Sequence, residues 1–318
     1  MSQKLFFSVL GLLLLGACES AESKQNDWLY QLQYAEPDAI SNSEYETVVM
    51  DPTRDGSNAT RYTNQEISSI QENGTKVLAY ISIGEASAFK SYWSEEWGEE
   101  VDGTLEVSES APDWLGRDPN PAWPESVKVR YWEEEWWRII EEELNRIQEA
   151  GFDGVYLDLV DAFEYWGDEQ TYQQELRLAG DPSNREDAAI RMMELVNRMA
   201  AYLRDTQADF EVFPQNAESI LFFDDGEYLE AINGIGIEDT WFREDQAIDS
   251  EEIETRLSYI KQVQDADKQV LSVDYVRVDS PSQQDKERVE EYYLKCREQG
   301  FACFAAYMDR ELDDFIPR

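Results

Sequence analysis

The chain has 318 residues and a formal net charge of −42, with 69 acidic against 27 basic residues. Nucleic acid is excluded as a partner, because its phosphates would be repelled by such a chain. Histidine is absent, which excludes His-dependent triads, His-ligated zinc and His general bases and leaves acid–base chemistry to Asp, Glu, Tyr, Lys or Cys. Acidic residues are spread along the whole chain, which favours adaptation to concentrated salt over recognition of one cationic substrate.

The first 27 residues have the pattern of a targeting segment followed by a linker. Lys4, the apolar stretch 5–15 and the small residues before Cys18 predict a signal peptide over residues 1–17. The apolar stretch is shorter than the about 20 residues of a membrane-spanning helix. A Cys in this position is typical of a bacterial lipoprotein, in which the Cys18 thiol is lipidated; a plain secretory signal is the alternative.

Residues 18–27 are polar and lack periodicity, so we expect the lipidated Cys18 and a linker to precede one folded domain over 28–318. The membrane is then a partner through the lipid, at the periplasmic or extracellular side of the cell envelope, and we expect a monomer. Only Cys296 and Cys303 remain beyond the lipidated cysteine. They are too few for a disulfide scaffold, although the compartment permits a bridge, and Cys303 is expected to pack in the core.

Eight apolar, β-branched or aromatic runs predict strands at 28–34, 47–50, 77–83, 155–160, 211–213, 234–237, 270–276 and 301–308. Stretches of helical period lie between most of them, at 64–72, 133–150, 186–205, 251–264 and 284–299, with a further helix expected at 219–231. Alternating strands and helices imply parallel strands, and eight such units predict an α/β fold, a closed (β/α)8 TIM barrel in a single domain. An open doubly wound sheet is the alternative, but no glycine-rich phosphate loop follows the first strand.

The connections after the third and fourth predicted strands, residues 85–131 and 161–185, are unusually long. The first has several prolines and predicts an ordered lid over the barrel mouth. Together they carry seven aromatic residues of interest: Trp93, Trp97, Trp114, Trp123, Phe163, Tyr165 and Trp166. Most of these are expected to anchor the core or the loops. Because aromatic faces on such loops also stack against sugar rings, we expect two or three to contact a ligand.

Acidic side chains stand at the expected carboxyl ends of several strands, where barrel enzymes hold their catalytic groups. They are Asp51, Glu85, Asp158, Asp161, Glu218, Glu238, Asp274 and Asp309. Asp158 stands out because its neighbours are apolar, and an ionised carboxylate there loses hydration and requires a compensating partner. A helix cap or a structural ion pair is the alternative explanation.

Facing carboxylates without histidine or a recognisable metal motif are typical of glycoside hydrolysis. One carboxyl is kept protonated as the general acid, and its partner acts as nucleophile or base. We expect no cofactor and no metal. A calcium or magnesium site built from carboxylates alone is the structural alternative.

Five motifs in chain order carry a resemblance to glycoside-hydrolase family 114, which spans about residues 28–309. They are VVMDPTRDG (48–56), KVLAYISIGEA (76–86), NPAWPESVKVRYW (120–132), GFDGVYLDLVDAFEYW (151–166) and PQNAE (214–218). The resemblance implies an endo-α-1,4-polygalactosaminidase on a TIM barrel, which cleaves a galactosamine-containing polysaccharide whose free amines would be cationic.

The resemblance also implies a catalytic pair, Asp158 and Glu218, with Asp158 as nucleophile or base and Glu218 as general acid, or the reverse. The implied substrate-binding residues are Asp51, Tyr80, Ser82, Glu85, Asp161, Tyr165, Asn216, Glu238 and Asp274. Two other functions stay open on the same residues. One is a carbohydrate-binding lipoprotein without catalysis, and the other is a hydrolase or lyase that uses the carboxylates with a divalent cation.

Overall fold

A computed structural model describes residues 28–168 and 177–317. The expected signal peptide, Cys18 and the linker lie outside the described residues, so their assignments stay predictions. Eight parallel strands follow one another along the chain and confirm the eight predicted ones. They are β1 (Trp28–Tyr30), β2 (Thr47–Met50), β3 (Lys76–Ser82), β9 (Gly154–Asp158), β10 (Glu211–Pro214), β11 (Gly234–Glu238), β14 (Gln269–Arg277) and β15 (Ala302–Tyr307).

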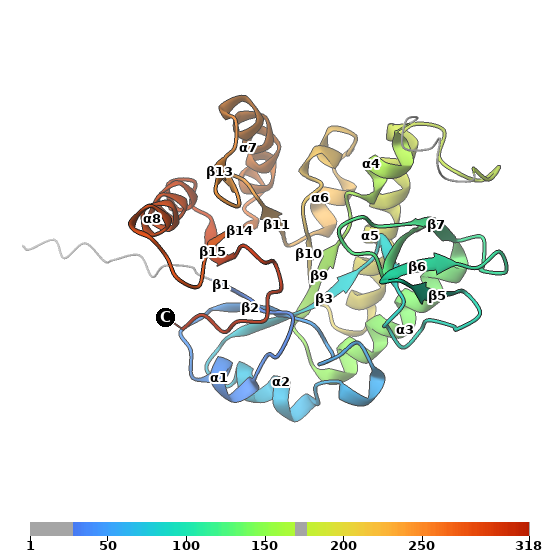
Figure 1. The fold of residues 1–318 in the computed structure, drawn as a ribbon, viewed down its shortest axis with the longest axis horizontal. Helices are drawn as coiled ribbons and strands as arrows, with labels where there is room; N and C mark the ends of the chain where they lie inside the picture. The colour runs from blue at the N-terminus through green and yellow to red at the C-terminus, as the bar shows by residue number, and fades with distance from the viewer. Residues whose placement is uncertain (1–27, 169–176, 318) are drawn as a thin grey trace, which may run out of the picture.

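The strands are arranged round the barrel in chain order (Figure 1). Strands β1-β2-β3-β9-β10 form one parallel ladder and β11-β14-β15 form another. The two ladders meet where Gln215, directly after β10, pairs with Gly236 of β11. On the other side β15 contacts β1, and the indole N–H of Trp28 donates a hydrogen bond of 2.9 Å to the Ser272 carbonyl of β14. This order is that of a (β/α)8 barrel.

Helices cover the outside of the strands. They are α1 (Pro37–Ser41), α2 (Asn64–Gln71), α3 (Glu134–Ala150), α4 (Ala162–Gly167), α5 (Arg185–Thr206), α6 (Glu227–Ala231), α7 (Ser250–Asp265) and α8 (Gln283–Glu298). The five predicted periodic helices are confirmed to within one or two residues. Capping boxes begin two of them: Thr63 with Glu66 starts α2, and Ser282 with Asp285 starts α8. Within the described residues, no helix has the length and apolar character needed to cross a membrane.

The helix expected over 219–231 is wrong as a single element. The chain instead forms a 3-10 turn (Glu218–Phe222) and then the short α6, separated by residues 223–226. Gly226 in this break has a φ of 110°, outside the helical region. The Asp224 carboxylate accepts hydrogen bonds of 3.0 Å from the backbone N–H groups of Tyr228 and Leu229, so it starts a new helix instead of continuing the old turn.

The long connection between β3 and β9 is ordered, as predicted, and forms an antiparallel excursion beside the barrel. It contains β4 (Glu85–Ser87), β5 (Gly98–Val101), β6 (Thr104–Val107), β7 (Leu115–Pro119) and β8 (Ser126–Val129), drawn in green at the right of Figure 1. Its tryptophans are mainly packing anchors, because Trp97 and Trp114 stack edge-on at 5.1 Å and Trp114 lies 5.2 Å from Trp136 of α3. Trp123 is 45% exposed. A role of this excursion as a lid stays a prediction.

The barrel interior is filled by aromatic rings. Trp28 lies with its ring centroid 5.2 Å from Tyr30, 5.9 Å from Tyr156 and 6.0 Å from Phe304. Gly236 is required on the facing strand, since a Cβ at this position would overlap the Tyr156 hydroxyl. This packing closes the interior below the strands' carboxyl ends.

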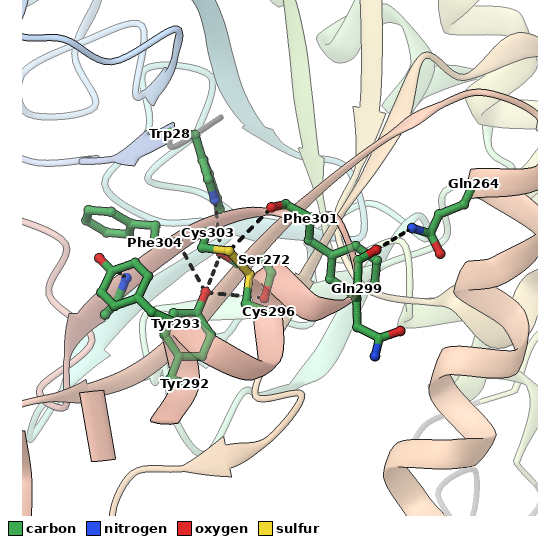
Figure 2. The surroundings of a disulfide bond; sticks show 11 residues. Trp28, Gln264, Ser272, Tyr292, Tyr293, Cys296, Gln299, Phe301, Cys303 and Phe304 are labelled. Carbon is green, nitrogen blue, oxygen red and sulfur yellow. Dashed lines mark hydrogen bonds between the residues drawn. A yellow bond between two sulfur atoms is a disulfide. The ribbon is translucent and has the colours of Figure 1, made fainter. Parts of the chain in front are cut away.

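A disulfide joins Cys296 in the last turn of α8 to Cys303 of β15 (Figure 2). Both residues are buried, so the expected core position of Cys303 is confirmed. The disulfide itself, which the compartment was expected to permit, was not predicted. Tyr292 of the same helix donates to the Ser272 carbonyl at 2.7 Å and accepts from the Phe304 N–H at 3.1 Å. Helix α8 is thus held covalently and by hydrogen bonds to the last two barrel strands.

Candidate active site

The direction of each side chain at the barrel mouth follows from its place on the strand, because residues two apart share a face. Tyr156 fills the interior, so Asp158 at the end of β9 also points inward. Tyr80 of β3 pairs in register with Tyr156 and points the same way. On β11, Gly236 faces the Tyr156 ring, which places Glu238 on the inner face. Three sequence-predicted residues, Tyr80, Asp158 and Glu238, therefore belong to one inward-facing group.

Asp158 has a hydrogen bond to each carboxylate oxygen. The Tyr80 hydroxyl donates to Oδ2 at 2.5 Å, and the Leu159 N–H donates to Oδ1 at 2.7 Å. Leu159 takes a φ of 60°, and Gly84 fits against it because a Cβ there would overlap the Leu159 carbonyl. Burial and then the negative charge of Glu238 raise the pKa of Asp158 to about 7, although the hydrogen bonds lower it.

Glu238 is held by the turn after β10 and by β14. The Asn216 amide donates to Oε2 at 2.9 Å, and the Glu238 N–H donates back to the Asn216 side chain at 3.0 Å. The Tyr275 hydroxyl donates to Oε1. Asn216 and Ala217 have φ values of 57° and 58°, a left-handed turn in which the Asn side chain reaches β11. The expected Asn216 and Glu238 are thus direct partners.

Glu218 begins the 3-10 turn that follows and is 7% exposed. Its carboxylate forms an ion pair with Arg256 of α7. The same guanidinium donates to the carbonyls of Glu238 at 2.9 Å and Asp239 at 2.8 Å. Arg256 therefore fixes Glu218 against the end of β11, the strand that carries Glu238.

Glu85, Asp161 and Tyr165 gather round one lysine from the excursion. Lys128 of β8 forms an ion pair with the nearly buried Glu85, which also accepts from Asn120 at 2.9 Å. The Lys128 ammonium lies 5.7 Å from the centre of the Tyr165 ring. Burial raises the pKa of Asp161 to about 6, while Lys128 lowers it.

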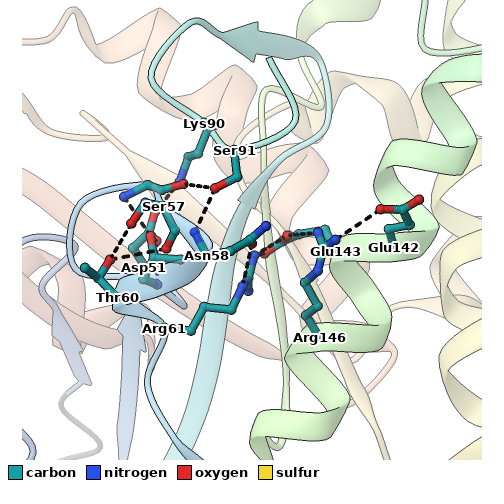
Figure 3. A network of polar contacts seen from close by, with 12 residues as sticks. Asp51, Ser57, Asn58, Thr60, Arg61, Lys90, Ser91, Glu142, Glu143 and Arg146 are labelled. Carbon is teal, nitrogen blue, oxygen red and sulfur yellow. Dashed lines mark hydrogen bonds and ion pairs between the residues drawn. The ribbon is translucent and has the colours of Figure 1, made fainter. Parts of the chain in front are cut away.

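Asp51 forms a second carboxylate–lysine contact. Lys90 approaches its Oδ2 at 2.6 Å, and the Thr53 N–H and hydroxyl donate to Oδ1 at 2.8 and 2.7 Å. Figure 3 shows this pair beside a polar network that continues through Arg61 to Glu143 of α3. Ser82, also predicted, donates to the Glu85 carbonyl at 3.1 Å.

Asp274 has a different setting from the other predicted residues. It is fully buried, and its carboxylate accepts three backbone N–H groups, from Thr240, Trp241 and Phe242, at 2.8 to 2.9 Å. Burial raises its pKa to about 7 against these three donors. Asp274 therefore fastens the loop after β11, while its neighbour Tyr275 faces Glu238.

The sequence reasoning missed the cations that hold these acids. Lys90, Lys128 and Arg256 each pair with a predicted carboxylate. Arg310, after β15, pairs with Asp239 at 2.5 Å and lies 4.1 Å over the Tyr275 ring. The scarcity of basic residues, 27 in the chain, is the signal that could have drawn attention to them. Among residues 28–168 and 177–317, no group of three or more His, Cys, Asp or Glu is placed to hold a metal ion.

Curated relatives cover most of the chain. An uncharacterised protein of Thermotoga maritima is 34% identical over 316 residues, which are 98% of this chain and 91% of the relative. Uncharacterised protein MJ1477 of Methanocaldococcus jannaschii is 36% identical over 289 residues, or 90% of this chain and 77% of the relative.

Solved structures share the fold. The glycoside hydrolase domain of PelA from Pseudomonas aeruginosa has a TM-score of 0.61 at 15% identity, covering 91% of this chain and 96% of that one. Aspergillus fumigatus Ega3, in complex with galactosamine, has a TM-score of 0.58 at 14% identity, covering 90% and 92%. The model of glycoside-hydrolase family GH114 matches residues 15–317. The chain is a TIM-barrel glycoside hydrolase and belongs to family GH114.

Proposed function

We propose that this glycoside hydrolase is endo-acting and cleaves α-1,4-linked, galactosamine-containing polysaccharide through Asp158 and Glu218. The observation that carries the proposal is the Asp158 carboxyl group, which points inward at the barrel mouth and accepts a hydrogen bond from Tyr80. Burial and the charge of Glu238 raise its pKa to about 7. The family membership supports the reaction class. The galactosamine in the Ega3 structure supports the sugar, because the ammonium groups of an amino-sugar polymer would be attracted to the carboxylates at the barrel mouth.

The two carboxyl groups are suited to different roles. Asp158, which keeps its proton to near neutral pH, is the proposed general acid and donates that proton to the glycosidic oxygen as the C–O bond breaks. Glu218 is ion-paired with Arg256 and is the proposed carboxylate, which attacks the anomeric carbon or takes a proton from the attacking water. The sequence resemblance allows two assignments of these roles. The one proposed here, with Asp158 as the acid, is the second of them.

The proposed setting is the cell envelope, with a monomeric domain held to the membrane by lipid on Cys18. The disulfide between Cys296 and Cys303 supports an oxidising compartment, since such bridges are rare where thiols are kept reduced. Metabolic labelling with a clickable fatty acid tests the anchor: wild type should be labelled and Cys18→Ser should not.

Reducing-end release from partly deacetylated α-1,4-galactosaminogalactan tests the activity. The protein would be a soluble form starting at Glu19, assayed in molar salt. Asp158→Asn and Glu218→Gln should each lose at least about a hundredfold in rate, and Glu298→Gln, on the exposed face of α8, is the matched control. Wild-type rates in both site variants would refute the assignment. Binding of the polymer with no cleavage would instead favour a carbohydrate-binding protein.

A substrate with a good leaving group separates the two roles. An aryl α-galactosaminide needs little proton donation, so the general-acid variant keeps activity on it whereas the partner variant does not. Retention by Glu218→Gln and loss by Asp158→Asn would reverse the roles. Loss of wild-type activity in chelator, restored by calcium or magnesium, would favour the cation-dependent alternative.

A further inference from the structure

Three hydrogen bonds hold Glu238 in place at the barrel mouth. Both of its oxygens are occupied, Oε1 by the Tyr275 hydroxyl and Oε2 by the Asn216 amide. Its own N–H returns a hydrogen bond of 3.0 Å to Asn216. Because Asn216 lies in the turn after β10 and Tyr275 lies on β14, the two neighbours of β11 set the position of this charge.

The hydrogen-bond partners of the Glu238 carboxylate are neutral, whereas three other acids at the mouth are paired with cations. Asp51 is paired with Lys90, Glu85 with Lys128 and Glu218 with Arg256. Within the described part of the chain, the hydrogen-bond donors to the Glu238 carboxylate are a hydroxyl and an amide. Neutral donors hold a carboxylate in place without cancelling its charge.

Two cations that interact with Glu238, Arg256 and Arg310, form their ion pairs with other carboxylates. Arg256 donates to the Glu238 carbonyl, but its ion pair is with Glu218. Arg310 pairs with Asp239 and stacks over Tyr275. Glu238 and Asp158 each lie two residues beyond a pair that packs together inside the barrel, Gly236 and Tyr156. The charge of Glu238 therefore acts on Asp158 across the mouth.

We infer that Glu238 is a positioning residue that acts through Asp158: its fixed charge holds the reaction's proton on the Asp158 carboxyl. This inference rests on the proposed function, in which Asp158 donates that proton. It gives Glu238 a task distinct from the substrate contact implied by the family resemblance. The polar and titratable groups that interact with Asp158 or Glu238 from the surrounding elements are Tyr30, Tyr80, Tyr156, Asp161, Asn216, Asp239, Tyr275 and Arg310.

Two like charges cannot both be ionised at close range without cost, so a fixed Glu238 carboxylate disfavours the ionised form of Asp158. Burial is the first cause of the raised pKa of Asp158, and Glu238 is the second. Tyr80 donates to the same carboxyl and opposes the effect. Removing the charge of Glu238 while keeping its shape should therefore lower the pKa of Asp158, because burial and the charge of Asp161 then remain against the hydrogen bonds from Tyr80 and Leu159.

Titration of Asp158 by carboxyl ¹³C NMR, without substrate, tests the inference in Glu238→Gln. The glutamine has the size of glutamate but no charge. We expect the proton affinity of Asp158 to fall by about tenfold. Glu238→Asp, which keeps the charge, is the matched control and should retain most of the affinity. An unchanged Asp158 titration in folded Glu238→Gln would overturn the inference.

The pH dependence of kcat/KM gives a second readout. With Asp158 as the acid, the alkaline limb of the Glu238→Gln profile should move to lower pH, whatever the change in the maximal kcat/KM. A uniform loss of activity at every pH, with both limbs in place, would show a structural role and overturn the inference. Tyr275→Phe frees Oε1 but keeps the charge, and should shift the limb less than Glu238→Gln. The NMR result stands even if galactosaminogalactan is not cleaved, so the two proposals can fail separately.

Discussion

The disulfide between Cys296 and Cys303 should make a measurable but modest contribution to stability. The two residues are separated by seven positions. Closing so short a loop restricts the unfolded chain little, and the loop-entropy relation gives about 2.4 kcal/mol for it at 25 °C. For a domain of this size the entropy of unfolding is about 0.6 kcal/mol per degree, so reduction should lower the melting temperature by about 4 °C.

Calorimetry of the oxidised and the fully reduced protein measures this shift directly, with thiol counting by mass spectrometry to prove reduction. Both sulfurs are buried, so reduction needs denaturant and refolding. The double variant Cys296→Ala/Cys303→Ala should melt near the reduced protein. An unchanged melting temperature, or a fall of more than about 10 °C, would refute the reasoning from loop length.

Three further predictions concern packing, pH and salt. Gly236→Ala should cost about 1–3 kcal/mol, because its Cβ would overlap the Tyr156 hydroxyl in the packed interior; urea unfolding should show no comparable loss for Gly180→Ala, which has room for a Cβ. The pKa values of Asp158 and Asp274, raised to about 7, lie above that of an unfolded aspartate. The stabilisation that these raised pKa values give is therefore complete below about pH 4 and is lost as the pH rises through about 7. The urea midpoint should be lower at pH 8 than at pH 5, and this difference should be smaller in Asp158→Asn. The net charge of −42 predicts a melting temperature that rises with sodium chloride, and a salt-independent value would contradict salt adaptation.

The strands were predictable because each is a short apolar run, and several helices end at a glycine before the next strand, as at Gly74, Gly151 and Gly300. The excursion was not resolved into strands, since Gly98–Val101 and Thr104–Val107 are short, contain glutamate and lack an apolar run. The helix expected at 219–231 looked continuous because one exposed glycine is a weak breaker signal. The Cys296–Cys303 pairing depends on how α8 docks on β15, which spacing alone does not reveal.

The expectation that catalytic groups lie at the carboxyl ends of barrel strands located the candidate site, but it did not predict the face on which each acid lies. Barrel strands are buried on both faces, so they are apolar throughout and the sequence does not distinguish inward from outward positions. Asp158 and Glu238 prove to be inward, whereas Asp274 lies one position from the inward Tyr275 and fastens a loop. The lysines and arginines that pair with the acids come from distant elements, and their contacts arise only when the barrel closes.

The antiparallel excursion leaves the barrel and rejoins it at almost the same point. It departs after Gly84, and on return the Val129 N–H donates to the Gly84 carbonyl at 3.0 Å. An insert whose two ends meet can be lengthened, shortened or exchanged without moving the strands that carry it. Lys90 and Lys128, which it supplies to Asp51 and Glu85, travel with it. Exchange of this insert, in evolution or by engineering, would therefore change the charges beside Asp51 and Glu85 without altering Asp158 on β9.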